Sequence, residues 1–122
     1  MAGTALPILA VTTPELAGYR IARYLGIVAG EAIMGTPFGA DFMAGIKDFT
    51  GSRVTEWESE VQQARHIAIV EMTQRAQAWS ANAVVGVTLD YEAMGQYGSI
   101  VLVMATGTAV VVEPVTPDKP PV

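Results

Sequence analysis

The stretch from Ile100 to Val112, which reads IVLVMATGTAVVV, decides the fold. Its valines and its Thr-Gly-Thr centre are typical of a β-strand, in which alternate side chains point to opposite faces. An antiparallel strand with one face in water should alternate apolar and polar residues. Both alternate sets are apolar here: Ile100, Leu102, Met104, Val110 and Val112 on one face, and Val101, Val103, Ala105, Ala109 and Val111 on the other. We therefore expect this strand to be covered on both faces.

The rest of the chain predicts a small α+β domain around this strand. Apolar segments bounded by glycine and proline predict strands over 8–12, 19–35 and 84–90, and the last of these forms a hairpin with the strand over 100–112. Phe38, Phe42 and Ile46 recur at helical spacing and predict a short helix that ends near Asp48. The predicted fold is thus a small antiparallel β-sheet with one short and one long helix.

The long helix is predicted from Thr55 to about Ala81. Thr55 and Glu58 fit a capping box, and Glu71 and Arg75 fit an i,i+4 ion pair. Asn82 is expected to end the helix in a left-handed conformation. The apolar stripe that should face the sheet is Trp57, Val61, Ala64, Ala68, Met72 and Trp79.

Two helices can cover only one face of such a sheet, so the other face needs a partner. The simplest partner is a second copy of the chain. Covering about 500 Å² of apolar surface would gain on the order of 12 kcal/mol before ordering costs. We therefore expect a homo-oligomer with its sheets facing inward and its long helices outside.

Composition excludes several functions. The 122 residues carry a net charge of −5, which disfavours nucleic acid or an anionic membrane as a partner. The chain has no cysteine and one histidine, which excludes disulfides, thiolate metal sites and multi-histidine zinc sites within one chain. There is no nucleophile-elbow, Walker or dinucleotide-binding motif. We therefore expect a protein that is not an enzyme.

Three segments are expected along the chain. Residues 1–7 form an N-terminal arm, 8–113 the folded domain and 114–122 a disordered tail, because Pro114, Pro117, Pro120 and Pro121 oppose regular structure. The N-terminus lacks the basic region of a signal peptide, and no apolar stretch is long enough for a membrane helix. These features predict a cytoplasmic protein.

Five segments together resemble the YbjQ family of small bacterial proteins. They are Gly30–Gly35 (GEAIMG), Asp41–Asp48 (DFMAGIKD), Glu60–Arg65 (EVQQAR), Ala83–Glu92 (AVVGVTLDYE) and Gly107–Val110 (GTAV). The resemblance covers residues 8–112. The chain departs from the family pattern at Gly51-Ser52-Arg53, where Gly-Gly-Arg is common, and in its longer proline-rich tail.

The resemblance implies a dodecin-like pentameric ring, with an inner β-barrel and outer helices. It also implies binding of a heavy-metal ion, a label that is itself inferential in the family. It implies no established reaction. The leading hypothesis is therefore a ring that binds a metal ion or a small ligand, and the alternative is a scaffold module whose tail recruits a protein partner.

The candidate metal ligands are three carboxylates, Glu31, Asp90 and Glu92. Asp90 and Glu92 lie two residues apart, so they share one face of a strand, and oxygen ligands suit Mg²⁺, Ca²⁺ or Mn²⁺. Each also has a structural reading, as a polar strand end or, for Glu31, as a paired charge. His66 is expected to be a solvated or packing residue, and the two tryptophans are expected to pack in the core rather than stack on a ligand.

Overall fold

The computed structural model describes residues 6–35, 51–95 and 100–115, with side chains from residue 58 onward in the helix. Its elements are β1 (Leu9–Ala10), β2 (Tyr19–Gly35), α2 (Gly51–Ala78), β3 (Ala83–Met94) and β4 (Ile100–Pro114). All four strands were expected, although β3 continues four residues past the predicted end. The short helix predicted over Phe38–Asp48 lies outside the described residues.

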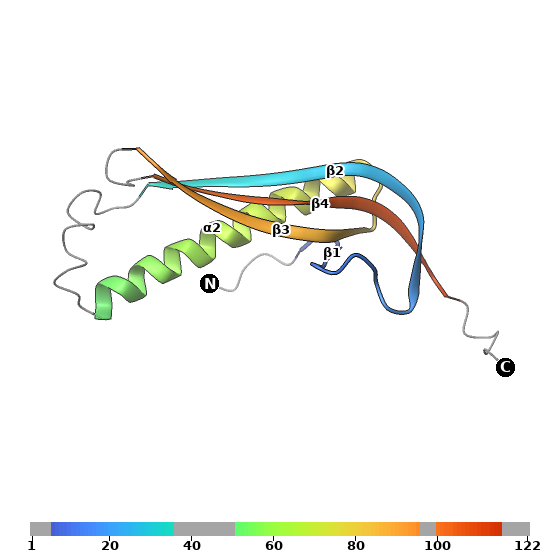
Figure 1. Cartoon of the computed structure of the whole chain (residues 1–122), viewed down its shortest axis with the longest axis horizontal. Coiled ribbons are helices and arrows are strands. Elements are labelled where there is room, and N and C mark those ends of the chain that lie inside the picture. Colours follow the sequence, from blue (N-terminus) through green and yellow to red (C-terminus); the bar gives the residue numbers. More distant parts are fainter. Residues whose placement is uncertain (1–5, 36–50, 96–99, 116–122) are drawn as a thin grey trace.

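The strands form one sheet in the order β1-β3-β4-β2. β4 is antiparallel to both β2 and β3, whereas β1 is parallel to β3, so the expectation of a wholly antiparallel sheet is wrong. Parallel pairing needs a long crossover connection, which β2 and α2 supply between β1 and β3. Figure 1 shows that the sheet curls strongly where β2 begins and β4 ends.

Helix α2 packs closely on one face of the sheet, mainly against β2 and β4. Its buried hydrophobic residues recur every four positions: Ala64, Ala68, Met72 and Ala76. The small side chains of the three alanines let the helix backbone approach β2. The approach is closest at Gly30, where an added Cβ would lie 2.1 Å from the Ala68 carbonyl oxygen. Below the helix the core is completed by Val28, Met34, Val84, Val87, Val101, Val103, Ala105 and Ala109.

The ends of α2 differ from the prediction. The helix begins at Gly51, so Thr55 lies inside it and the predicted capping box does not mark its start. At the other end Ser80, with φ of 71°, takes the left-handed position assigned to Asn82. The N–H groups of Ser80 and Ala81 donate to the carbonyls of Gln77 and Ala76, which is a Schellman ending. The helix therefore stops two residues earlier than the asparagine suggested.

A second, smaller core lies on the opposite face of the sheet, at its curled end. The residues buried there are Ala83, Val85, Val110 and Val112. Ile21 packs against them, together with Val11 and Leu16 from the segment that connects β1 to β2. This covering segment is held by hydrogen bonds from the Gly86 and Val87 N–H groups to the carbonyls of Thr13 and Val11. The chain thus covers part of the face for which the sequence reasoning required a partner.

Candidate functional site: the open face of the sheet

The other half of that face is not covered by any described residue. In an antiparallel ladder, paired residues point to the same face. Because Val101 and Val103 point toward the helix, Leu102 and Met104 point away from it, and so do their partners on β2 and β3. We call this surface the open face; its residues are Ile27, Glu31, Ile33, Asp90, Glu92, Leu102 and Met104.

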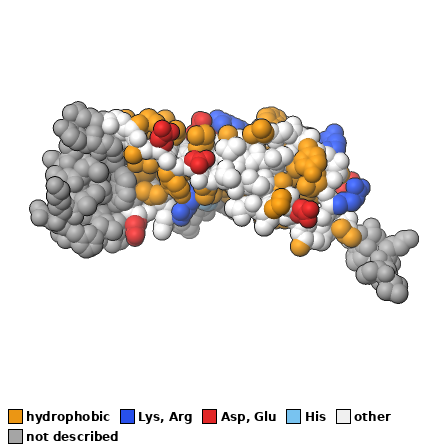
Figure 2. All heavy atoms as spheres, viewed as in Figure 1, with side chains coloured by type: hydrophobic (Ala, Val, Ile, Leu, Met, Phe, Trp, Pro, Cys, Tyr) orange, Lys and Arg blue, Asp and Glu red, His pale blue; other side chains and the backbone are white. Residues whose placement is uncertain are grey.

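The open face is apolar at its centre, and on the β2 side two isoleucines lie on either side of Glu31. Ile27 and Ile33 are 76% and 73% exposed, and Leu102 and Met104 between the flanking strands are half-buried. Scattered exposed aliphatic side chains are ordinary, but Ile33 lies directly beside Leu102, and Met104 is the next residue of β4 on the same face; Ile27 lies further along β2, beside Thr108. On the side of the molecule seen in Figure 2, hydrophobic side chains likewise gather in patches with acidic side chains among them.

All three candidate metal ligands lie on the open face. Glu31 and Asp90 flank Met104 from opposite sides, and Glu92 pairs with Leu102 on the next rung. Strands two apart are separated by roughly 10 Å, so Glu31 lies far from the β3 carboxylates. Among the described residues no three His, Cys, Asp or Glu side chains are close enough to hold a metal ion. One copy of this face therefore supplies carboxylates without assembling a metal site.

The backbone of Glu31 is bound to the helix rather than left at the sheet edge. Its N–H donates to Glu71 Oε1 at 2.7 Å, and two residues away Arg75 Nη1 donates to the Ala29 carbonyl at 2.9 Å. The same two helix side chains form the predicted ion pair, with 3.4 Å between Arg75 Nη2 and Glu71 Oε2. Because β2 is an edge strand, this pair occupies backbone groups that another strand could otherwise use.

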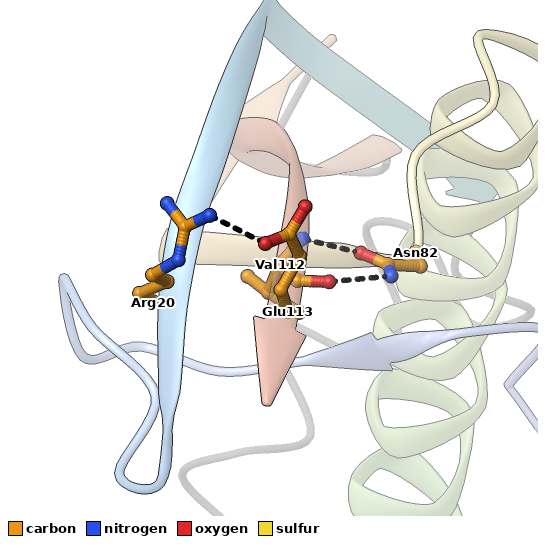
Figure 3. Close-up of polar contacts among 4 residues, drawn as sticks. All are labelled: Arg20, Asn82, Val112 and Glu113. Carbon is orange, nitrogen blue, oxygen red and sulfur yellow. Dashed lines mark hydrogen bonds and ion pairs between the residues drawn. The ribbon is translucent and has the colours of Figure 1, made fainter. Parts of the chain in front are cut away.

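At the curled end, polar side chains hold β4 from both sides (Figure 3). The Asn82 side-chain amide donates to the Val112 carbonyl at 3.0 Å, and its oxygen accepts the Val112 N–H at 2.8 Å. On the other side Arg20 forms an ion pair with Glu113. The Asn82 side chain therefore makes the pair of hydrogen bonds that the backbone of a neighbouring strand would make with β4. The sequence predicted only that Asn82 ends the helix.

Other residues singled out from the sequence lie elsewhere. His66 is half-buried on α2. Trp79 is 47% exposed, so its assignment to the buried stripe is wrong; the helix has already ended before it. It lies beside Gly26, where an added Cβ would be 3.7 Å from its ring. The Trp57 side chain lies outside the described residues.

Tyr24 and Leu25 depart from the simple alternation of side chains along β2. The ladder between β2 and β4 shifts register twice, between Ile21 and Arg23 and between Tyr24 and Gly26. Each shift reverses the alternation, so Tyr24 points outward and is 72% exposed, whereas Leu25 packs toward the helix core. The available signal was Gly26, which has φ of 137° at the second shift.

The fold and this face define a small α+β protein with one long helix on a curled mixed sheet. The chain belongs to the YbjQ family, whose description reads "Putative heavy-metal-binding" and which matches residues 8–113. It is similar to a UPF0145 protein of Carboxydothermus hydrogenoformans, with 49% identity over 107 residues that cover 88% of this chain and 98% of that protein.

A solved structure shows the same fold at lower similarity. It is a protein of unknown function from Pediococcus pentosaceus, assigned to the DUF74 family, with 14% identity and a TM-score of 0.59. The match covers 87% of this chain and 98% of the other. No helix among the described residues is long and apolar enough to cross a membrane.

Proposed function

We propose that this protein works as a cytoplasmic homo-oligomeric ring, most simply a pentamer, in which the open faces of neighbouring copies are buried. The observation that carries the proposal is the exposure of Ile33 beside half-buried Leu102, with Ile27 exposed further along the same face beside Thr108. Fully burying an isoleucine side chain contributes roughly 1.5–3 kcal/mol, so each copy would gain several kcal/mol at this surface alone. The inner β-barrel and outer helices of a dodecin-like ring agree with α2 covering the opposite face.

The ring would bind a metal ion or a small ligand through carboxylates that no single copy brings together. Glu31, Asp90 and Glu92 lie on the surface that assembly would turn toward other copies. Repetition around a symmetric ring would place several carboxylates near one another and would provide the oxygen ligands that Mg²⁺, Ca²⁺ or Mn²⁺ prefer. The family description supports metal binding in general but names heavy metals, whereas these carboxylates favour harder ions. We propose no catalytic step.

The assembly is tested by light scattering coupled to size-exclusion chromatography at micromolar concentration. We expect the wild type to elute as a multiple of the 12.9-kDa chain. Replacing both Ile27 and Ile33 by glutamate should reduce the mass to that of one chain, with the circular dichroism spectrum unchanged. Ile67→Glu is the matched control, because Ile67 is 48% exposed on the helix, away from the open face. A monomeric wild type, or an unchanged mass in the double variant, would refute the assembly.

The proposed metal binding is tested on the untagged oligomer by isothermal titration with Mg²⁺, Mn²⁺, Ca²⁺, Zn²⁺, Cu²⁺ and Ni²⁺. We expect binding of at least one hard ion, and loss of that binding in Glu31→Gln or Asp90→Asn. Glu60→Gln serves as the control, since Glu60 is exposed on α2. An intact oligomer that binds none of these ions would refute the proposed metal binding. The remaining function would be that of a scaffold that assembles without a metal ion.

A further inference from the structure

A groove lies at the curled end of the sheet, outside the open face. It has a volume of about 500 Å³ and lies between the segment before β2 and the first residues of β2 itself. This volume is within the range of ordinary ligand sites. The lining residues are Pro14, Glu15, Leu16, Tyr19, Arg20, Ile21 and Tyr24.

The lining is the kind that accommodates proline-rich peptides. Grooves that bind polyproline II segments are walled by aromatic rings, which pack flat against proline rings and leave polar tips for backbone carbonyls. Tyr19 and Tyr24 are 47% and 72% exposed, and both point to the face that carries Val110 and Val112. Pro14 and Leu16 complete the apolar part of the wall, and Glu15 and Arg20 supply one charge of each sign.

A proline-rich segment of the same chain starts at the edge of this groove. β4 runs to Pro114, which pairs with Tyr19, and the next N–H, that of Val115, donates to the Gly18 carbonyl at 2.9 Å. β4 thus includes Pro114, the first residue of the segment expected to be disordered, and Val115 adds one hydrogen bond beyond the strand. The sequence that follows, over 116–122, is TPDKPPV and lies outside the described residues.

We propose that residues 116–122 dock in the groove of their own chain, with Pro120 and Pro121 against the rings of Tyr19 and Tyr24. Thr116-Pro117-Asp118-Lys119 has proline and aspartate at the two central positions of a turn, which suits the reversal needed at the end of β4. The three residues after the turn span about 9 Å in the polyproline II conformation. Tyr19 and Tyr24 are five residues apart, roughly 16 Å along a strand, so this length leads back about half of the way from Tyr19 and the Tyr24 ring must lean toward it.

Tethering makes weak docking sufficient. A short linker gives an effective concentration of a few mM, and proline-rich segments lose little conformational entropy on binding. If the intrinsic dissociation constant is about 1 mM and the effective concentration about 3 mM, roughly three quarters of the grooves are filled. This site is distinct from the open face and does not depend on the proposed function.

The test uses the full chain and compares tyrosine reactivity between variants. Replacing Pro120 and Pro121 by serine should raise the nitration rate of Tyr19 and Tyr24 about fourfold, the change expected when three-quarters occupancy is lost. Tyr91 is the internal control, because it is 47% exposed, like Tyr19, but lies on β3 with its hydroxyl 3.4 Å from Arg65 Nη1. Thr116→Ser is the control variant, since it retains every proline.

Nuclear Overhauser contacts decide which chain supplies the tail. Contacts between proline ring protons and the rings of Tyr19 or Tyr24 are expected in uniformly labelled protein. They should be absent when filtered for pairs between labelled and unlabelled chains in a mixed sample. Equal nitration in the serine variant, or contacts seen only between chains, would overturn the proposal. A tail that contacts no tyrosine and instead binds a separate protein would overturn it as well.

Discussion

The contact between α2 and β2 makes Gly30→Ala a severe test of the packing. A Cβ at this position would lie 2.1 Å from the Ala68 carbonyl oxygen and 2.4 Å from the Met72 backbone nitrogen. Both atoms belong to the helix backbone, so no side chain can rotate away and the helix itself must shift. Overpacking a core costs typically 1–3 kcal/mol. We expect Gly30→Ala to lower the free energy of unfolding by about 3 kcal/mol, at the upper end of that range.

Gly35→Ala is the matched control. Gly35 lies on the same strand, and an added Cβ there meets nothing within 4 Å. We expect a change of less than about 1 kcal/mol, since the substitution alters only strand propensity. Chemical denaturation at one fixed protein concentration measures both variants, because assembly would otherwise shift the midpoint. Equal midpoints for the two variants would refute the close packing of α2 on β2.

Three further substitutions test two polar contacts and the backbone conformation at the end of α2. Asn82→Ala removes two hydrogen bonds to Val112. It should lower the free energy of unfolding, measured by chemical denaturation, by about 2 kcal/mol, at about 1 kcal/mol for each bond. An unchanged free energy of unfolding would contradict the strand-like role of Asn82. Ser80→Gly should stabilise the chain by about 0.5–1 kcal/mol in the same assay, because glycine adopts the left-handed conformation without a Cβ penalty. Glu71→Ala should speed hydrogen exchange of the Glu31 amide roughly tenfold, because a hydrogen bond to a charged acceptor is worth about 1.5 kcal/mol. An unchanged exchange rate would show that Glu71 does not protect the edge of the sheet at β2.

The sequence predicted the strands well because their burial pattern is strong over many residues. The β2 bounds, Tyr19–Gly35, match the expectation, and the apolar run that begins at Ile100 forms β4. The helix ends were predicted less well. Thr55 with Glu58 fits a cap pattern, yet the helix begins four residues earlier. Capping residues indicate where a helix can start, whereas the start that is realised depends on the backbone that precedes it.

Simple alternation fails on β2 only between its two register shifts. A strict alternation from Tyr19 onward puts Leu25 with Ile27, but the shift between Tyr24 and Gly26 separates them onto opposite faces. Because the second shift cancels the first, Ile27 and Ile33 lie on the face of Tyr19, as alternation predicts. A glycine within a strand indicates that a bulge is possible without fixing which neighbour is the extra residue. The spacing of two placed Asp90 and Glu92 on one face, whereas Glu31 was singled out separately. That Glu31 shares their face follows from the register of three strands, which no single segment encodes.

The two ends of the sheet meet the same demand for burial in different ways. At the curled end, Val110 and Val112 are covered by Val11 and Leu16 of the same chain. At the other end, Leu102 on the same strand and face has no such cover among the described residues, and Ile33 beside it is 73% exposed. Because the covering segment pairs only with β3 residues up to Val87, it stops short of the open face. The requirement for a second copy, first inferred for the whole strand, is therefore confined to the part of β4 before Val110. Ile27 and Ile33, the residues replaced in the assembly test, both pair with that part.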